Sequence, residues 1–201
     1  MKLIFSNPTI PGTQLKRDDI NGLTGKAFLR QVFFVSDGVM LSQIRKIAGI
    51  DGSTLQNWTK RGWVSASRLK RYGIDQVAHI LLINMLRSCL QLDKIAWLLE
   101  YINGSIDDES DDIICDADLY DVICTVLDRL EAQEWFEINT IRTTAEEALA
   151  DYSEPVPGAK QRLINALEII LTSYLASMIK SNADGKMEEL FSSVKGDSGT
   201  N

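Results

Sequence analysis

The stretch that decides the fold is LSQIRKIAGIDGSTLQNWTKRGWV, Leu41–Val64. Apolar residues recur in it at helical spacing, which predicts a short amphipathic helix over 41–48 and a second over 54–61. Gly49 and Gly62 follow these segments, and glycine suits the left-handed backbone that ends a helix. Two short helices joined by a tight turn form a helix-turn-helix arrangement.

The second of these helices carries side chains suited to nucleic-acid recognition. Leu55 and Trp58 fall on the side that packs against the first helix. The other positions hold hydrogen-bond donors and acceptors, which can reach base edges or phosphates in a major groove. These residues are Ser53, Thr54, Gln56, Asn57, Thr59, Lys60 and Arg61.

The charge of the chain is distributed unevenly. The 201 residues carry a formal net charge of −7. Residues 1–37 hold five basic and three acidic side chains, residues 38–103 nine and four, and residues 104–201 seven and 21. The three segments therefore carry +2, +5 and −14. A basic segment within an acidic protein indicates an anionic partner for that segment.

Helical spacing continues through most of the chain and predicts an all-α protein. Trp63–Val64 and Leu69–Tyr72 could form two brief extended pieces of a small β-hairpin. The domains that we predict are an arm with a helix (1–37), the helix-turn-helix module (38–104), a helical half (105–180) and a disordered polar tail (181–201).

Two features of the helical half bear on its role: an acidic run at its start and an apolar stripe on its last helix. The acidic run Asp107–Asp112 marks the boundary and lacks the spacing of a calcium-binding loop, so a solvated linker is favoured. The last long helix has an apolar stripe that could close an intramolecular core or form a subunit interface. The stripe consists of Leu163, Leu167, Ile170, Leu171, Tyr174, Leu175 and Met178.

The sequence offers little support for catalysis. His79 is the one histidine, so no Ser-His-Asp triad can be assembled beyond it, and both GxGxxG and GxxxxGK[ST] are absent. We therefore expect no enzyme, no catalytic residue, no metal and no cofactor. The three cysteines form no CxxC pair and are expected to be reduced and partly buried.

Apolar runs are too short to indicate a membrane span. The longest, Val77–Ile83, is well below the roughly 20 residues that a bilayer requires, and no signal peptide opens the chain. The sequence therefore predicts a soluble cytoplasmic protein that does not contact a membrane. Asn84, within an apolar run, is interpreted as a satisfied core amide or a helix-pairing residue, and Trp58 as a core residue.

The helix-turn-helix stretch resembles the MerR-type winged helix-turn-helix domain. That family has a helix, a Gly-small turn, a T-L-x-x-aromatic helix, a closing glycine and a basic wing that ends in Y-R-x-Y; Leu69–Tyr72 falls on the wing motif. The runs INML (Ile83–Leu86) and LLEYIN (Leu98–Asn103) are closer to a bacterial family of unknown function, whose members join a MerR-like module to a helical half.

The resemblance implies a set of DNA-contacting residues. Thr54, Gln56 and Asn57 match the DNA-facing positions of the recognition helix, and Lys70 matches the wing arginine that contacts phosphate. Gln56 stands where the family usually has arginine, and the wing is shorter than usual. The predicted DNA-binding residues are Ser53, Thr54, Gln56, Asn57, Lys60, Arg61, Arg68, Lys70, Arg71 and Tyr72.

Two functions follow as hypotheses. The first is a sequence-specific, dimeric transcriptional regulator that binds double-stranded DNA through residues 53–61 and 65–72, with the acidic half as a dimerisation or protein-partner surface. The second is a protein-interaction module that uses the winged-helix scaffold without binding DNA. A continuous positive surface across Lys60, Arg61, Lys70 and Arg71 favours the first, and interruption by C-terminal acids favours the second.

Overall fold

The structure is a computed structural model that describes residues 8–34, 37–106, 108, 110–133 and 137–197. The predicted arm, acidic run and tail each extend partly outside these residues. The described chain is mostly helical, which confirms the all-α prediction. In chain order its elements are η1 (Asp18–Ile20, a 3₁₀ turn), α1 (Gly25–Phe33), β1 (Val39–Met40), α2 (Leu41–Ala48), α3 (Gly52–Lys60), β2 (Arg71–Tyr72), α4 (Ile74–Leu86), α5 (Leu92–Asn103), α6 (Asp116–Glu131), α7 (Thr140–Ala148) and α8 (Ala159–Asp197).

The turn between α2 and α3 forms as the sequence predicts. Gly49 has φ +66° and ends α2, and Ile50 is buried beneath the turn. At the end of α3, Gly62 has φ +75°, its N–H donates to the Thr59 carbonyl, and the Trp63 N–H donates to the Trp58 carbonyl at 3.0 Å. This pair of bonds is a Schellman motif, which ends the helix and turns the chain.

The small sheet differs from the predicted hairpin. β2 pairs antiparallel with β1, which precedes α2, with Val39 opposite Tyr72 and Met40 opposite Arg71. The predicted extended piece Trp63–Val64 forms no strand. The sheet therefore ties the segment after α3 to the start of α2, so that α2, α3 and the two strands form one compact unit.

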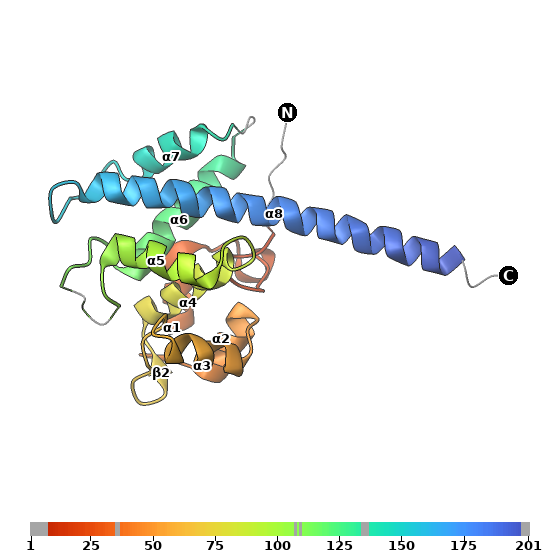
Figure 1. Cartoon of the computed structure of the whole chain (residues 1–201), viewed down its shortest axis with the longest axis horizontal. Helices are drawn as coiled ribbons and strands as arrows, with labels where there is room; N and C mark the ends of the chain where they lie inside the picture. The colour runs from red at the N-terminus through yellow and green to blue at the C-terminus, as the bar shows by residue number, and fades with distance from the viewer. Residues whose placement is uncertain (1–7, 35–36, 107, 109, 134–136, 198–201) are drawn as a thin grey trace.

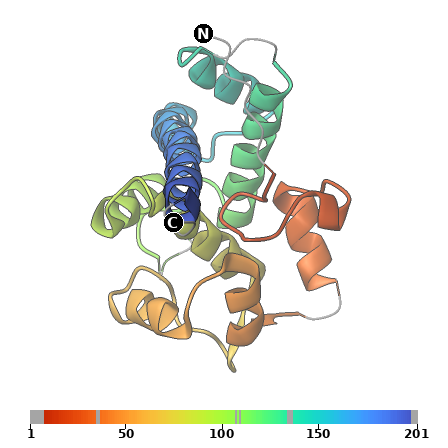
Figure 2. The same cartoon turned by 90° about the vertical axis from the view of Figure 1, so that its right-hand side faces the viewer.

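Helix α4 lies at the centre of the molecule. It contacts α1, α2, α5, α6 and α8, and its side chains belong to a single hydrophobic cluster that extends from Ile10 to Leu175. Figures 1 and 2 show α2 and α3 at one end of the molecule and α6, α7 and the first half of α8 at the other. Residues on both sides of the predicted boundary at 104 and 105 thus share one core.

The N-terminal arm joins the two ends. Asn84 of α4 is half-buried and donates from Nδ2 to the carbonyl oxygens of Gly12 (2.8 Å) and Ala48 (2.7 Å), so it connects α4 with the arm and with the end of α2. The hydroxyl of Tyr120 in α6 donates to the Pro11 carbonyl at 2.7 Å. Arg17 forms ion pairs with Asp128 and Glu131 of α6.

The predicted disordered tail is wrong for residues 181–197, because α8 continues as helix to Asp197. The apolar stripe 163–178 of this helix is largely buried in the core of the same chain, which decides between the two roles left open for it. From Ile179 to Val194 every side chain is exposed, and this half of α8 projects beyond the body (Figure 1).

Two glycines provide a matched test of the packing between the arm and α4. Gly12 (φ +74°) and Gly22 (φ +73°) share a backbone conformation, but a Cβ at Gly12 would lie 2.3 Å from the Leu81 carbonyl oxygen, whereas a Cβ at Gly22 meets nothing within 4 Å. We expect Gly22→Ala to lower the free energy of unfolding by about 1 kcal/mol through the left-handed backbone alone. Gly12→Ala should cost about 1–3 kcal/mol more, because the arm must shift.

Urea denaturation of both variants measures this difference. Equal destabilisation by the two substitutions would show that the arm does not pack against α4 as described.

Candidate functional site

Helix α3 presents a continuous polar face to solvent. Ser53, Gln56, Asn57 and Lys60 are all exposed, and their i, i+3, i+4, i+7 spacing places them on one side of the helix. Leu55 and Trp58 lie on the opposite side and are buried, which confirms Trp58 as a core residue. The predicted residues Thr54 (half-buried) and Arg61 (exposed) border this face.

A tight basic hairpin follows α3. The N–H of Arg68 donates to the Arg71 carbonyl at 3.0 Å, and the N–H of Arg71 donates to the Arg68 carbonyl at 2.9 Å. Leu69 and Lys70 between them have φ +50° and +62°, the signature of a type I′ turn. The side chains of Arg68, Lys70 and Arg71 are exposed.

Tyr72 is a correction to the predicted contact set. Its side chain is only 8% exposed and belongs to the hydrophobic core, so it cannot contact a ligand at the surface. Side chains alternate along a strand, so with Arg71 directed outward Tyr72 is directed inward. Its role is to anchor the hairpin.

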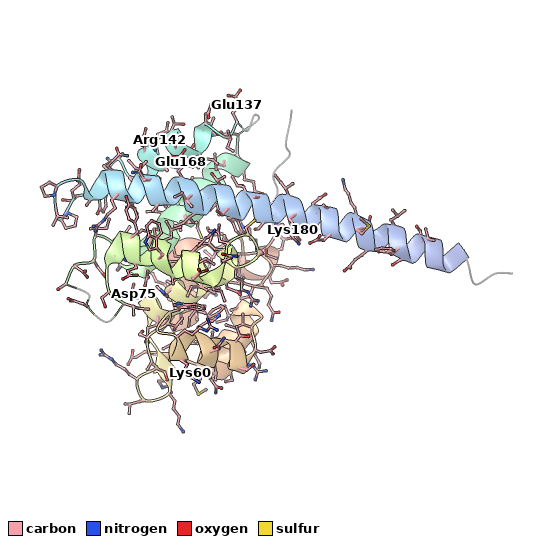
Figure 3. The ribbon with its side chains drawn as sticks, in the orientation of Figure 1. Lys60, Asp75, Glu137, Arg142, Glu168 and Lys180 are labelled. Atoms are coloured by element: carbon pink, nitrogen blue, oxygen red, sulfur yellow. The ribbon has the colours of Figure 1, made fainter. Side chains whose placement is uncertain are left out.

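Four of the cations on and beside α3 have no acidic partner among the described residues. Lys60, Arg61, Arg68 and Lys70 take part in none of the ion pairs that the described residues form. Arg17, Lys26 and Arg142 by contrast are paired with carboxylates of the C-terminal half. Figure 3 shows Lys60 at the end of the molecule opposite to Glu137 and Glu168.

Three further surface residues were missing from the predicted set. Arg45 and Lys46 are exposed in the last turn of α2, and Arg45 lies beside the start of α3, where a Cβ on Gly52 would be 3.7 Å from its Cδ. The sequence shows that both residues are basic and that neither lies on the apolar face of α2. Leu69, at the tip of the hairpin, is 96% exposed, and no sequence signal distinguished it.

A cavity of about 660 Å³ separates the end of α3 from the acidic segment. The guanidinium of Arg61 stacks on the Trp63 ring at 5.0 Å from its centroid along one wall. Six carboxylates also line the cavity: Asp75, Asp93 and Glu100 come from the module, and Asp108, Asp112 and Asp116 come from the C-terminal half. C-terminal acids therefore approach the module beside Arg61, while Arg68 and Lys70 lie outside this cavity.

His79 has a structural role beyond that of an ordinary helix residue. Its Nδ1 lies 2.9 Å from Oδ2 of Asp116 and its Nε2 lies 3.0 Å from the Trp63 carbonyl oxygen. Both partners are acceptors, and only the doubly protonated ring can donate to both. Burial alone would lower the pKa of His79, but the hydrogen bond and charge of Asp116, with the Trp63 carbonyl, raise it above 6.5. The imidazolium thus joins the segment after α3 to the start of α6.

Two of the three cysteines are thiols of low reactivity. Burial raises the pKa of Cys124 to about 12 and, with the hydrogen bond to Asp118, that of Cys115 to about 12. Cys89 is exposed, which differs from the predicted partial burial. The described residues bring together no group of three or more histidine, cysteine, aspartate or glutamate side chains suited to a metal ion.

Comparisons with known proteins identify a family. The model of the family described as "Domain of unknown function (DUF1836)" matches residues 23–123, half of the chain, and the chain belongs to this family. The matched range extends from α1 into α6 and includes the polar face of α3 and the hairpin.

A second comparison gives a curated relative. The chain is 28% identical over 100 residues to the uncharacterized protein YkrK of Bacillus subtilis (strain 168); the match covers 48% of this chain and 43% of that protein. The chain thus matches less than half the length of this relative. No solved structure matches the chain.

The hairpin geometry predicts a stabilising substitution. Non-glycine residues in the left-handed region cost about 1–2 kcal/mol each, and Asn-Gly is the preferred pair for a type I′ turn. Replacing Leu69-Lys70 by Asn-Gly should therefore raise the free energy of unfolding by about 1–2 kcal/mol, measured by urea denaturation. Unchanged or reduced stability would contradict the described turn.

The pair of His79 and Asp116 predicts a pH dependence. The folded-state pKa of His79 is raised, so the pair stabilises the fold fully below the unfolded-state pKa of about 6.5 and loses this contribution as pH rises through the folded-state pKa. The difference in free energy of unfolding between wild type and His79→Gln should thus shrink as pH increases. Urea titrations on both proteins from about pH 6 to about pH 9 test this, and a difference independent of pH would refute the protonated pair.

Proposed function

We propose that this member of the DUF1836 family is a cytoplasmic, homodimeric transcriptional regulator that binds specific sequences of double-stranded DNA through a MerR-like winged helix-turn-helix module. In this proposal α3 is the recognition helix and the hairpin Arg68–Arg71 is the wing. The observation that carries the proposal is the combination of a solvent-facing polar stripe on α3 with three neighbouring cations, Lys60, Arg68 and Lys70, that form no ion pair among the described residues.

The polar face of α3 suits direct reading of bases. An α-helix with its side chains is about 10–12 Å across, and the major groove of B-DNA is about 12 Å wide. Gln56 and Asn57 are adjacent on the exposed face. Amide side chains of this kind can bind adenine with two hydrogen bonds, to N6 and N7. Ser53 and Lys60, at the two ends of the same face, would then contact flanking phosphates.

The cations around α3 suit binding of the phosphate backbone. Arg68, Lys70 and Arg71 lie on the hairpin, and Arg45 and Lys46 lie on α2. Phosphate contacts supply affinity that does not depend on sequence and that falls steeply with salt. In this arrangement the hairpin and α2 would fix the register in which α3 enters the groove.

The position of the acidic half favours DNA binding at the hairpin, and it favours the interaction-module alternative beside Arg61. The C-terminal acids approach the module at the cavity beside Arg61, whereas the hairpin cations lie outside it. Figures 1 and 2 place α6, α7 and the body of α8 at the end away from α3. At physiological salt, charges separated by more than about 8 Å are largely screened, so these acids would repel DNA only weakly.

Two sets of variants separate the roles of hairpin and recognition helix. Lys70→Ala should weaken binding on all sequences alike and reduce the slope of log affinity against log salt by about one, because one phosphate contact is lost. Gln56→Ala should cost about 1–3 kcal/mol on the preferred sequence and much less on others, because a base contact is lost. Fluorescence anisotropy with a duplex selected from a random pool measures both effects.

Arg129→Ala is the matched control. Arg129 is an exposed cation at the end of α6, in the acidic half. Its removal should leave affinity and salt slope unchanged. Failure of the wild-type protein to bind any duplex at low salt would disprove the proposal, and equal effects of all three substitutions would disprove the assigned roles.

A further inference from the structure

One face of helix α5 combines carboxylates with an exposed aromatic ring. Asp93, Trp97 and Glu100 all line the cavity beside Arg61, and their i, i+4, i+7 spacing places them on one side of the helix. All three side chains are exposed, and the indole of Trp97 stands between the two carboxylates along the helix. We call these three residues the acidic-aromatic face.

The lining of the same cavity already holds a cation on an indole. The guanidinium of Arg61 stacks on the Trp63 ring, and both residues line the cavity. Tryptophan is the ring that attracts cations best, and arginine is the cation found on it most often. Among the described residues no cation lies over Trp97, so the acidic-aromatic face offers a second indole of the same kind.

The cavity carries a net negative charge. Among the described residues that line it, six are carboxylates and two are cations, Arg61 and the protonated His79, which leaves a net charge of −4. Asp116 contacts His79 at 2.9 Å, and Asp75 accepts a hydrogen bond from the N–H of Ala117 at 2.9 Å. These two carboxylates hold α4 against the start of α6, so they serve the fold.

Asp93 and Glu100 differ from these two carboxylates. Neither takes part in an ion pair among the described residues. Glu100 lies in the last turn of α5, where the dipole of a helix disfavours negative charge. Its carboxylate is therefore stabilised more by a bound cation than by the helix that carries it.

Trp97 is ordered before any partner arrives. Its side chain is 61% exposed, and its ring stacks on that of Tyr101 with 5.6 Å between the centroids and 21° between the planes. Tyr101 lies outside the cavity, so the stack supports the indole at the rim. A side chain that is already ordered loses little conformational freedom on binding. Tryptophans of this kind commonly dominate the energy of protein interfaces.

We propose that the acidic-aromatic face docks a basic peptide segment of another protein. An arginine of that segment stacks on Trp97 and pairs with Asp93 or Glu100. The planar guanidinium suits both contacts, because it stacks on aromatic rings and donates two parallel hydrogen bonds to a carboxylate.

A peptide fits this surface better than a nucleic acid or a small molecule does. The charge of the cavity repels phosphate groups. The acidic-aromatic face extends over about 10 Å of helix, a length that an extended chain can follow. Small-molecule sites are mostly apolar and enclose most of their ligand, whereas Asp93, Trp97 and Glu100 are exposed.

Selection from a random library of short peptides displayed on phage, with the full chain as bait, tests the proposal. Enriched peptides should contain arginine. In a synthetic copy of an enriched peptide, replacement of that arginine by glutamine should weaken binding about tenfold, because both the stack and the ion pair are lost. Fluorescence anisotropy of the labelled peptide measures the affinity.

Substitutions in the protein locate the peptide. Trp97→Ala should weaken binding about tenfold, and Glu100→Gln about threefold, because an exposed ion pair contributes less than an aromatic anchor. Two matched controls should leave affinity unchanged: Phe191→Ala removes a ring with the same 61% exposure on α8, and Glu147→Gln removes an exposed carboxylate on α7. All four side chains are exposed, so the fold should be kept, which circular dichroism verifies.

Three results would overturn the proposal. One is a selection that enriches no peptide, or only peptides without basic residues. Another is an equal loss of affinity in Glu147→Gln, which would reduce the binding to general attraction by an acidic protein. The third is binding of arginine amide alone as tightly as the selected peptide, which would make the cavity a small-molecule site. The docking goes beyond the DNA-binding proposal and is measured without DNA, so each can fail while the other stands.

Discussion

Burial of α4 on all sides is the constraint on which the rest of the structure depends. An element so apolar must be covered, and α1, α2, α5, α6 and α8 cover it together. Helix α4 holds both α2 and α6 in place. Asn84 donates to the Ala48 carbonyl at the end of α2, and His79 contacts Asp116 at the start of α6. The two ends of the molecule are therefore parts of one packed body, and the surface of α3 is held in a fixed relation to the acidic helices.

This arrangement separates the acidic and basic side chains of the molecule in space. Acids of α6 pair with Arg17 and Lys26, so part of the negative charge holds the N-terminal arm and α1 in place. The side chains of these ion pairs are partly exposed to solvent, so the pairs contribute only modestly to stability. Their larger consequence is spatial, because the acids are satisfied far from α3. The net charge of −7 thus says little about the field around the hairpin.

Sequence reasoning succeeded where local chemistry decides structure. Gly49 and Gly62 end their helices because they adopt left-handed backbone at little cost, and Leu55 and Trp58 point inward because helical periodicity requires it. Sequence reasoning failed where contacts between distant segments decide the structure. The pairing of β2 with β1 joins residues 31 and 33 positions apart, and two-residue strands carry almost no periodic signal. Burial of Tyr72 and the contacts of His79 follow from that tertiary packing.

The continuation of α8 was hidden for a different reason. A helix that is apolar on one side shows a clear 3.6-residue period, whereas a helix apolar on two opposite sides has little net periodicity. Between residues 180 and 194, polar residues outnumber apolar ones such as Met187, Leu190, Phe191 and Val194, so the segment resembles a solvated tail. Beyond Met178 the helix buries no side chain through Val194, so the buried face that makes a helix recognisable in a sequence is missing there.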